Sequence, residues 1–144
     1  MAAQTGDVLF TSDVTFAEVR FGIEQMPDPT RRSDLVHWLD RTLRPLFAGR
    51  VLPVTEDALL RWRLMLEDGR KTGHTFSEPD LLISALAALA ELIVVSRDTS
   101  EFIAAGVPVF DPWNWKLYAG NREHVIADAD GPDALSKATF LIPI

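Results

Sequence analysis

The sequence predicts an α/β domain, a three-layer α/β/α sandwich in which helices cover both faces of a parallel sheet. Short apolar runs that suit buried strands alternate along the chain with longer segments that have helical periodicity and capping residues. Strands that alternate with helices pair in parallel, because each helix returns the chain across one face of the sheet. With 144 residues, 47% of them hydrophobic, the chain is long enough to bury a substantial core.

The first strand and the first helix follow one another directly. Residues 8–11 (Val-Leu-Phe-Thr) form an apolar run of strand length. Ser12 or Thr15 can cap the helix that comes next. Thr15 and Glu18 have the spacing of a capping box, so Glu18 has a structural interpretation beside any functional one.

A long helix and an edge strand come next. A break at residues 27–29 (Pro-Asp-Pro) precedes a helix over about residues 30–47, which Pro45 is expected to kink or end. Residues 51–54 then suit a strand. Pro53 favours the edge of the sheet, because proline donates no backbone hydrogen bond.

The helix within Ser77–Ala90 is the centre of the predicted fold. It follows a helix that begins at Thr55 and a basic, glycine-containing loop over residues 69–75. Because the helix is apolar almost all round, we expect it to be buried. Ser77 suits its N-cap, and Asp80 three residues later is either a second capping group or a ligand.

The remaining segments predict a buried strand, a short helix and a strand at the sheet edge. Residues 92–95 (Leu-Ile-Val-Val) are the clearest strand in the chain and lead to Asp98. Residues 99–105 fit the short helix, and residues 107–110 fit a last strand at the edge of the sheet. The polar residues 121–137 are typical of a loop.

Three acidic residues are placed to meet at one edge of the predicted sheet. Ligands of open parallel sheets bind at the carboxyl ends of the strands. Asp98 follows a strand there, while Asp80 and Glu18 lie near the starts of helices entered from the same edge. Clustered carboxylates repel one another unless a cation neutralises them, and oxygen ligands favour Mg²⁺ or Mn²⁺. Such ions activate water for phosphodiester cleavage.

The composition excludes several classes of site. Cysteine is absent, which rules out disulfides, thiolate metal sites and cysteine nucleophiles, and three scattered histidines argue against zinc. A net charge of −7 argues against a general electrostatic binder of nucleic acid, although basic residues in the first half can form a local basic surface. No apolar run is long enough to span a bilayer and the N-terminus lacks a signal-peptide pattern, so we expect no membrane association and a cytoplasmic location.

Several blocks in the same order resemble the PIN-domain ribonuclease toxins of the VapC family. The blocks are Thr15–Ile23, Leu46–Pro53, the segment from Asp80 to Ala87, Ser96–Thr99 and Val109–Trp113. The similarity covers about residues 5–115 and is closest to the trafficking-regulator toxins, which pair with a small DNA-binding antitoxin. It implies that Glu18, Asp80 and Asp98 are three of the family's metal-binding and catalytic acids. The implied activity is Mg²⁺- or Mn²⁺-dependent endoribonuclease action on an RNA substrate.

The chain departs from the family pattern at its start. The family begins with a strand that ends in Asp-Thr-Asn or similar, and nothing here corresponds to that strand, to its acid or to the helix after it, roughly 25–30 residues in all. Asp7 is no substitute, because it precedes its strand and is expected at the opposite end. We therefore expect weak or absent ribonuclease activity, and the sequence does not decide whether Met1 is the true start.

The missing strand belongs in the middle of the sheet, so the sequence also predicts a gap. The gap can be closed by the neighbouring strands, by the apolar residues 138–144 at the C-terminus, or by another chain. Pro143 argues against the second route, because a central strand needs all its backbone donors. We expect a homodimer or an obligate complex, with the apolar C-terminal residues packed against protein.

Two interpretations remain open at the level of the sequence. Residues 1–114 are expected to form a truncated PIN-like domain and residues 115–144 a C-terminal extension. The protein is either a ribonuclease toxin or a non-catalytic module that binds an antitoxin or another PIN subunit. A phosphoacceptor receiver is disfavoured, because Asp111-Pro112-Trp113 follows the last predicted strand where a receiver needs a lysine.

Overall fold

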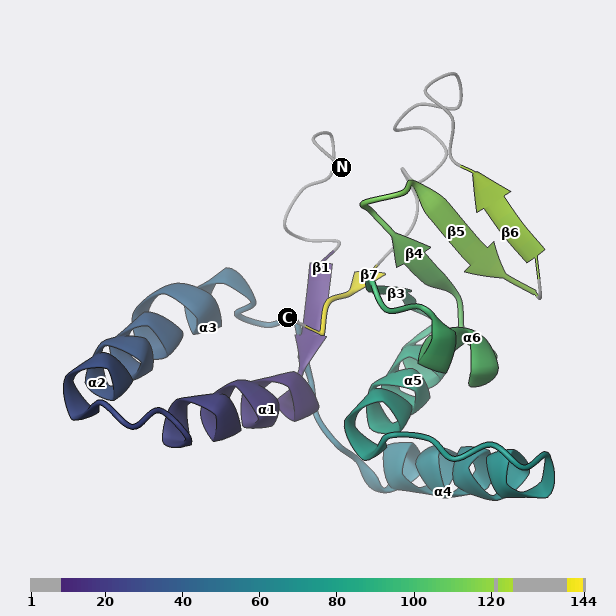
Figure 1. Cartoon of the computed structure of the whole chain (residues 1–144), viewed down its shortest axis with the longest axis horizontal. Coiled ribbons are helices and arrows are strands. Elements are labelled where there is room, and N and C mark those ends of the chain that lie inside the picture. The colour runs from purple at the N-terminus through teal and green to yellow at the C-terminus, as the bar shows by residue number, and fades with distance from the viewer. Residues whose placement is uncertain (1–8, 121, 126–139, 144) are drawn as a thin grey trace.

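The computed structural model describes residues 9–120, 122–125 and 140–143, which build a mixed α/β fold around one twisted sheet (Figure 1). The described strands lie in the order β2-β1-β7-β3-β4-β5-β6. Their bounds are β1 Leu9–Ser12, β2 Val51–Leu52, β3 Ile93–Val95, β4 Val109–Asp111, β5 Lys116–Ala119, β6 Arg122–Val125 and β7 Phe140–Leu141. The predictions for Val8, Asp7, most of the loop 121–137 and residues 138, 139 and 144 concern positions outside the described residues.

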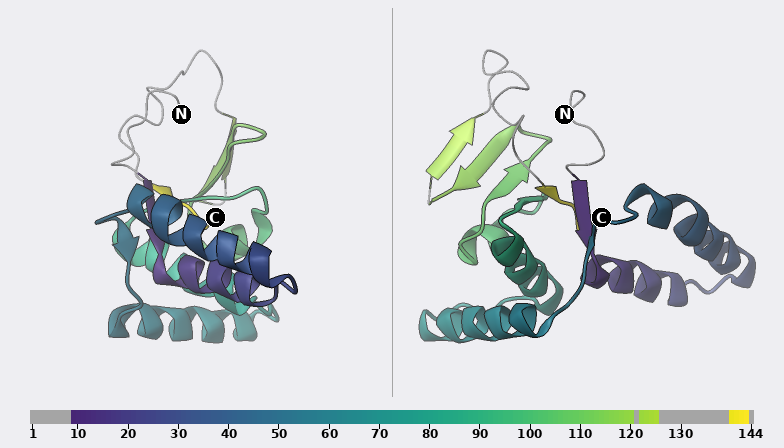
Figure 2. Two further views of the ribbon diagram at one scale, coloured as in Figure 1. Left: turned by 90° about the vertical axis from the view of Figure 1, so that its left-hand side faces the viewer. Right: turned by 180° about the vertical axis from the view of Figure 1, so that it is seen from behind.

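Helices pack on both faces of this sheet, which confirms the predicted α/β fold class. Their bounds are α1 Asp13–Glu24, α2 Pro29–Trp38, α3 Arg44–Leu46, α4 Glu56–Lys71, α5 Glu78–Ala90 and α6 Ser100–Ala104, with a π-helical turn, η2, at Leu39–Leu43 between α2 and α3. In two further views α4 and α5 lie side by side, and α1 lies between α5 and α2, in contact with both (Figure 2). None of the described helices is long and apolar enough to cross a membrane.

β7 fills the middle of the sheet from the C-terminal end of the chain. It pairs in parallel with β1 on one side and with β3 on the other, so that Phe140 faces both Leu9 and Ile93 across the ladders. The Thr11 hydroxyl donates to the Ile142 carbonyl at 2.8 Å, and the Ile142 N–H donates to the Phe10 carbonyl at the same distance. The C-terminal segment therefore occupies the position in which the sequence predicts a gap.

The objection from Pro143 was wrong, because β7 is too short to include that residue. Phe140 and Leu141 are the paired residues, and both are 0% exposed. The next backbone donor, the N–H of Ile142, is satisfied by β1, and Pro143 lies beyond it. A proline after the last paired residue removes no hydrogen bond from the ladder.

The alternating residues of the central strands supply two separate cores. Leu141, Val94 and Val109 face one side of the sheet, where they belong to the cluster formed with α5. Phe140 packs on the other side against Phe110, with ring centroids 6.3 Å apart. A strand buried on both faces needs apolar residues at every position, and Phe140-Leu141 meets that need.

The sequence analysis predicted a strand at residues 107–110 and placed it at the edge of the sheet. The strand forms, as β4, but the edge position was wrong, because the sheet continues beyond it. β4 is followed by the antiparallel hairpin of β5 and β6, so five parallel strands are extended by two antiparallel ones. The reversal between β4 and β5 is stabilised by Asp111, whose Oδ1 accepts from the Trp113 N–H at 2.9 Å. Trp115 takes the left-handed conformation, with φ of 53°, which completes the tight turn.

Pro45, which was expected to kink or end the helix, is preceded by a π-helical turn, which is wider than an α-helical turn. The Arg44 N–H donates to the carbonyl of Leu39, five residues back, which is π-helical hydrogen bonding. Pro45 has no N–H to donate, and its ring clashes with a carbonyl four residues earlier in a regular α-helix. The wider turn accommodates the ring, and the helical path continues to Leu46.

Candidate functional site

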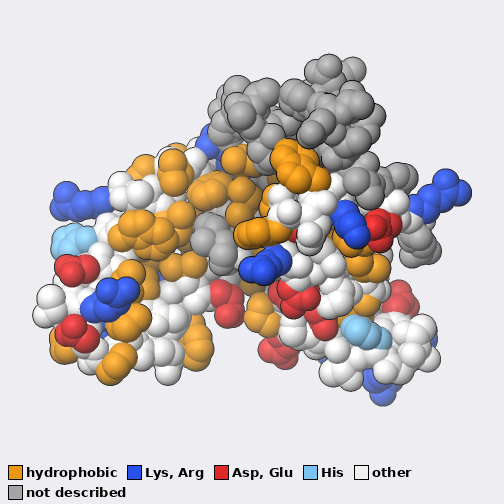
Figure 3. Space-filling model, turned by 45° about the horizontal axis from the view of Figure 1, so that its top comes forward, with side chains coloured by type: hydrophobic (Ala, Val, Ile, Leu, Met, Phe, Trp, Pro, Cys, Tyr) orange, Lys and Arg blue, Asp and Glu red, His pale blue; other side chains and the backbone are white. Residues whose placement is uncertain are grey.

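Glu18, Asp80 and Asp98 line one cavity of about 410 Å³. Three elements supply them: α1, α5 and the loop after β3. The other lining residues are Thr15, Ser77, Pro79, Ile83, Ser96, Phe102 and Pro143. Figure 3 shows acidic side chains on both sides of a hollow near the centre of one face. The structure thus brings together the three acids that the sequence analysis selected, while their roles stay predictions.

Glu18 does not act in a capping box. The N-cap of α1 is Ser12, whose hydroxyl accepts from the Thr15 N–H at 3.2 Å. Thr15 is therefore the third residue of the helix rather than its cap, and Glu18 lies in the second turn, past the free N–H groups. This placement removes the structural interpretation of Glu18 and leaves an exposed carboxylate on the cavity wall.

Asp80 lies in the first turn of α5 and is half-buried. Its burial raises the pKa of the carboxyl, and the negative charges of Glu101 and Asp98 raise it further, against the opposing effect of a hydrogen bond with the Ser77 side chain. Its main-chain carbonyl accepts from the Ser84 hydroxyl at 2.8 Å, four residues along the helix. The ionised form of Asp80 is thus disfavoured by its surroundings, which are desolvating and negative.

Asp98 follows the carboxyl end of β3 in a short turn. The Ser96 hydroxyl donates to the Asp98 carbonyl at 2.9 Å, and the Ser100 hydroxyl donates to Asp98 Oδ1 at 3.1 Å. These two bonds fix the backbone and one carboxylate oxygen. Such neutral donors hold the side chain in place without cancelling its charge.

The donor set suits a hard divalent cation, although it is not a closed cage. The three cavity acids offer oxygen ligands alone, which Mg²⁺ and Mn²⁺ prefer over nitrogen or sulfur. Within residues 9–120, 122–125 and 140–143, no three acidic or histidine side chains approach closely enough to hold one ion together. Mg²⁺ is usually held by only one or two carboxylates and keeps several waters, so the open arrangement fits this ion.

The central strand brings a proline to the cavity where another carboxylate is expected. β7 lies between β1 and β3, and Pro143, two residues after it, lines the same cavity as Asp80 and Asp98. The family pattern described above has an acid at the end of its central strand. Among the described residues, the carboxylates that line this cavity are those of Glu18, Asp80 and Asp98.

Glu101 is a fourth acid near Asp80 that sequence reasoning missed. Its Oε2 accepts from the Ser77 N–H at 3.3 Å, so a residue of α6 caps the start of α5. The same oxygen lies 4.0 Å from His74 Nε2. No local pattern signals this contact, because 24 residues separate Glu101 from Ser77.

The other feature that sequence reasoning missed is an aromatic and basic pair beside the cavity. The Arg97 guanidinium lies over the ring of Trp113, 5.8 Å from its centroid. Arg97 is the chain neighbour of both Ser96 and Asp98, which line the cavity. The sequence signal that was available is the Asp-Pro-Trp-Asn run at residues 111–114, a turn pattern that holds an aromatic side chain.

Comparisons with known proteins agree with this architecture. A family model described as "PIN domain" matches residues 1–107. A VapC ribonuclease of Sinorhizobium fredii is 36% identical over 111 residues, which cover 77% of this chain and 79% of the relative. The toxin FitB of Neisseria gonorrhoeae is 33% identical over 106 residues, which cover 74% of this chain and 76% of FitB.

Solved structures give the same result. The crystal structure of FitAcB from Neisseria gonorrhoeae superimposes with a TM-score of 0.72 at 31% identity, covering 78% of this chain and 81% of the other. A structure of FitAB bound to an IR36 DNA fragment gives a TM-score of 0.71 at 29% identity, with 78% of each chain covered. The chain therefore belongs to the PIN-domain family, in the group that contains the VapC ribonucleases and the FitB toxin.

Proposed function

We propose that this protein is a metal-dependent endoribonuclease toxin of a type II toxin–antitoxin pair, with activity weakened because Pro143 contributes no carboxylate to the cavity that it lines. The observation that carries the proposal is the convergence of Glu18, Asp80 and Asp98 on one cavity at the edge of the parallel strands. A relative 36% identical to this chain is named as a VapC ribonuclease, and divalent-metal dependence is general among such enzymes.

Asp80 and Asp98 are the dominant ligands in this proposal. Burial, and to a smaller degree the charges of Glu101 and Asp98, raise the pKa of Asp80, and a divalent cation held by Asp80 and Asp98 would stabilise the ionised carboxylates. Mg²⁺ or Mn²⁺, when bound, supplies an activated water and stabilises the leaving oxygen. Glu18 faces the pair from α1 and is placed to orient water or to accept a proton from it.

The proline at position 143 supports weak rather than full activity. Two ions held in line with a scissile phosphate need enough fixed negative charge to retain both. In this chain the central strand contributes an apolar ring to the cavity instead of a carboxylate. We therefore infer a reduced affinity for the ions and slow cleavage.

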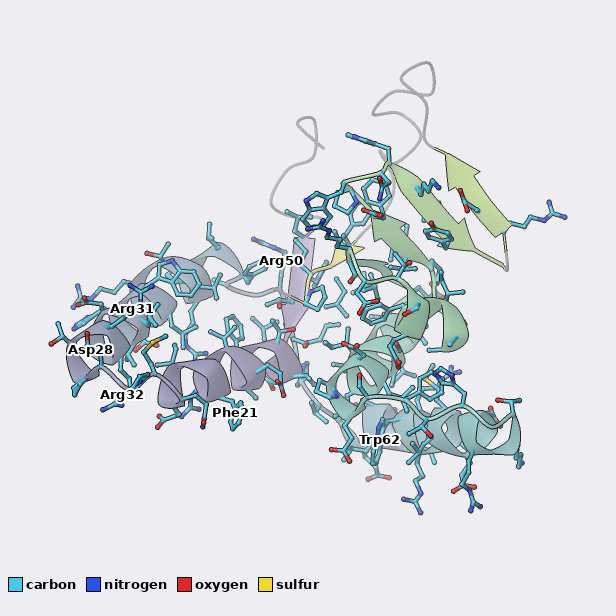
Figure 4. The ribbon with its side chains drawn as sticks, viewed as in Figure 1. Phe21, Asp28, Arg31, Arg32, Arg50 and Trp62 are labelled. Carbon is cyan, nitrogen blue, oxygen red and sulfur yellow. The ribbon has the colours of Figure 1, made fainter. Side chains whose placement is uncertain are left out.

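Two separate apolar surfaces support association with two kinds of partner. Phe21 on α1 is 62% exposed, and Leu60 on α4 is 58% exposed. Figure 4 shows Phe21 of α1 on the same side of the molecule as Arg31 and Arg32 of α2, and Trp62 of α4 on the other side. We infer that these apolar surfaces serve a homodimer and a complex with a small DNA-binding antitoxin. The DNA-binding partner is inferred from a structure of FitAB bound to a DNA fragment, to which this chain is similar.

A non-catalytic module that binds an antitoxin or another PIN subunit is the second candidate. The observation that favours it is the same Pro143, together with the lack of a three-acid metal cage among the described residues. The fold and its exposed apolar surfaces do not depend on catalysis.

Cleavage of RNA by the purified chain decides between the two. We expect slow cleavage with Mn²⁺ that stops in EDTA and in Asp98→Asn. Glu78→Gln is the matched control, because Glu78 lies in the first turn of α5 but does not line the cavity. Cleavage that survives in Asp98→Asn contradicts the proposed site, and a complete lack of metal-dependent cleavage supports the non-catalytic module.

A further inference from the structure

We propose that Arg97 and Trp113 form a platform that binds single-stranded RNA beside the acidic cavity, with a base stacked on Trp113 and a phosphate paired with Arg97. This inference rests on the proposed function, and it names the residues that hold the substrate rather than those that cleave it.

The platform adjoins the cavity through Arg97. Ser96 and Asp98 both line the cavity, and Arg97 lies between them in the loop after β3. Its guanidinium lies 5.8 Å from the centroid of the Trp113 ring. Figure 3 shows hydrophobic, basic and acidic side chains next to one another near the centre of this face. A phosphate paired with Arg97 would therefore be held by the residue next to Asp98 in the loop after β3.

A buried carboxylate fixes the turn that presents Trp113. Asp111 is 4% exposed, and its Oδ1 accepts from the Trp113 N–H at 2.9 Å and from the Asn114 N–H at 3.3 Å. Its Oδ2 accepts from Asn114 Nδ2 at 2.8 Å. Asn114 and these backbone donors, with the charge of Arg97, hold the pKa of Asp111 below its usual value. The carboxylate that accepts these hydrogen bonds therefore stays ionised further into acid than an ordinary aspartate.

The ring of Trp113 is left in water although the turn around it is ordered. Trp113 is 62% exposed, whereas Trp115 two residues later packs edge-on against Phe110 with centroids 5.8 Å apart. A tryptophan ring is among the largest apolar surfaces that a side chain can bury, so an exposed ring on a fixed turn offers a surface that a ligand can cover. A nucleic-acid base suits such a ring, because every base has a planar face that can stack on it. Stacking of this kind does not require a particular nucleotide sequence.

A local cation, rather than the overall charge of the chain, favours RNA as the occupant of this platform. The chain has a net charge of −7 and its cavity is acidic, so long-range attraction of a phosphate backbone is weak. Recognition then depends on stacking and on a local cation. Arg97 supplies that cation one residue from Asp98, and guanidinium binds phosphate with charge-assisted hydrogen bonds.

Binding of a short, fluorescently labelled, single-stranded RNA in EDTA tests the platform without cleavage. We expect Trp113→Ala to weaken binding roughly 5- to 100-fold and Trp113→Phe to keep most of it, because a stacked base loses its partner only in the first variant. Arg97→Gln should reduce the slope of log K against log salt by about 0.7, the change for one lost phosphate contact with a single strand.

Trp38→Ala is the matched control, since Trp38 is also exposed but lies at the end of α2 and is not the ring under the Arg97 guanidinium. It should bind RNA as the unmodified protein does. Because Trp113 is exposed, the melting temperature of Trp113→Ala should not change, which separates lost binding from lost folding.

Replacing one nucleotide at a time by an abasic residue identifies the stacked base. One abasic position should weaken binding by the unmodified protein and have no further effect in Trp113→Ala. Equal RNA binding by Trp113→Ala, no RNA binding by the unmodified protein, or a loss confined to binding of a protein partner overturns the proposal. Failure of the proposed function has a different signature, namely Trp113-dependent RNA binding without metal-dependent cleavage.

Discussion

Asp80 has a carboxylate whose ionised form is destabilised in the folded protein. Burial removes water from it, and Glu101 and Asp98 add negative potential, so that its pKa lies above its usual value. A carboxyl with a raised folded pKa stabilises the fold below its unfolded pKa, and this contribution is lost as the pH rises through the folded value. The metal-free protein is therefore under electrostatic strain at neutral pH.

We predict that Asp80→Asn stabilises the metal-free protein at neutral pH, because the amide carries no charge to desolvate or repel. The gain should shrink as the pH falls toward 3.8, the usual pKa, where Asp80 itself becomes protonated. Urea unfolding in EDTA across this pH range measures the effect. Glu78→Gln removes a charge from the same turn without entering the cavity, and an equal gain in that variant would contradict the explanation.

We predict that Pro143→Asp increases both Mn²⁺ affinity and RNA cleavage. Position 143 follows the central strand and lines the acidic cavity, so a carboxylate there adds fixed negative charge beside Asp80 and Asp98. Pro143→Ala is the control that removes the ring without adding charge. Equal Mn²⁺ affinity in the two variants, measured by calorimetry, would show that position 143 does not face the ions.

At the scale of the elements, β7 is the strand on which the fold depends most. It is only two residues long, yet it joins β1 to β3 and places one residue in the core on each face. Without it, the backbone groups of two neighbouring strands would lack partners, and each buried unpaired group costs about 1–3 kcal/mol.

We predict that Leu141→Ala lowers the free energy of unfolding by about 2–5 kcal/mol, the usual cost of a large-to-small change in a core. Leu141 is 0% exposed, whereas Leu64 on α4 is 54% exposed and provides the matched control in Leu64→Ala. Guanidinium denaturation measures both. If the two variants lose equal stability, β7 does not dock as described.

The elements that sequence reasoning predicted are those with local signals. The strand at residues 92–95 is a continuous apolar run, and the helix after Ser77 has its cap and its apolar length in one segment. No local sequence pattern predicted the position of β7 in the sheet. That position depends on β1 and β3, the two strands that flank it, and both are far from β7 in the sequence. β6 was missed because its polar residues belong to a segment that resembles a loop, and no strand was predicted at residues 116–119, which form β5.

The candidate site was predictable to the extent that strand ends determine it. Asp80 and Asp98 could be placed from the rule that ligands gather at the carboxyl ends of parallel strands. Glu101 could not, because it reaches Ser77 across 24 residues of sequence. The pairing of Arg97 with Trp113 likewise depends on the β4–β5 turn, which is a tertiary feature.

At the scale of the whole molecule, the C-terminal residues share the sheet of the family domain. β5, β6 and β7 all come from residues 115–144, and they extend or complete the sheet that the earlier residues begin. We retain the division into residues 1–114 and 115–144 as a proposal about which residues follow the family pattern and which are added. Stability and activity are then properties of the full chain.

Calorimetric titration of the full chain with Mn²⁺ is the sharpest check of the proposal that Asp80 and Asp98 hold a divalent metal ion. We predict measurable binding by the unmodified protein, weaker binding as the pH falls through the raised pKa of Asp80, and loss of binding in both Asp80→Asn and Asp98→Asn. Glu78→Gln should bind Mn²⁺ as the unmodified protein does. Undiminished Mn²⁺ affinity in Asp80→Asn would contradict the account.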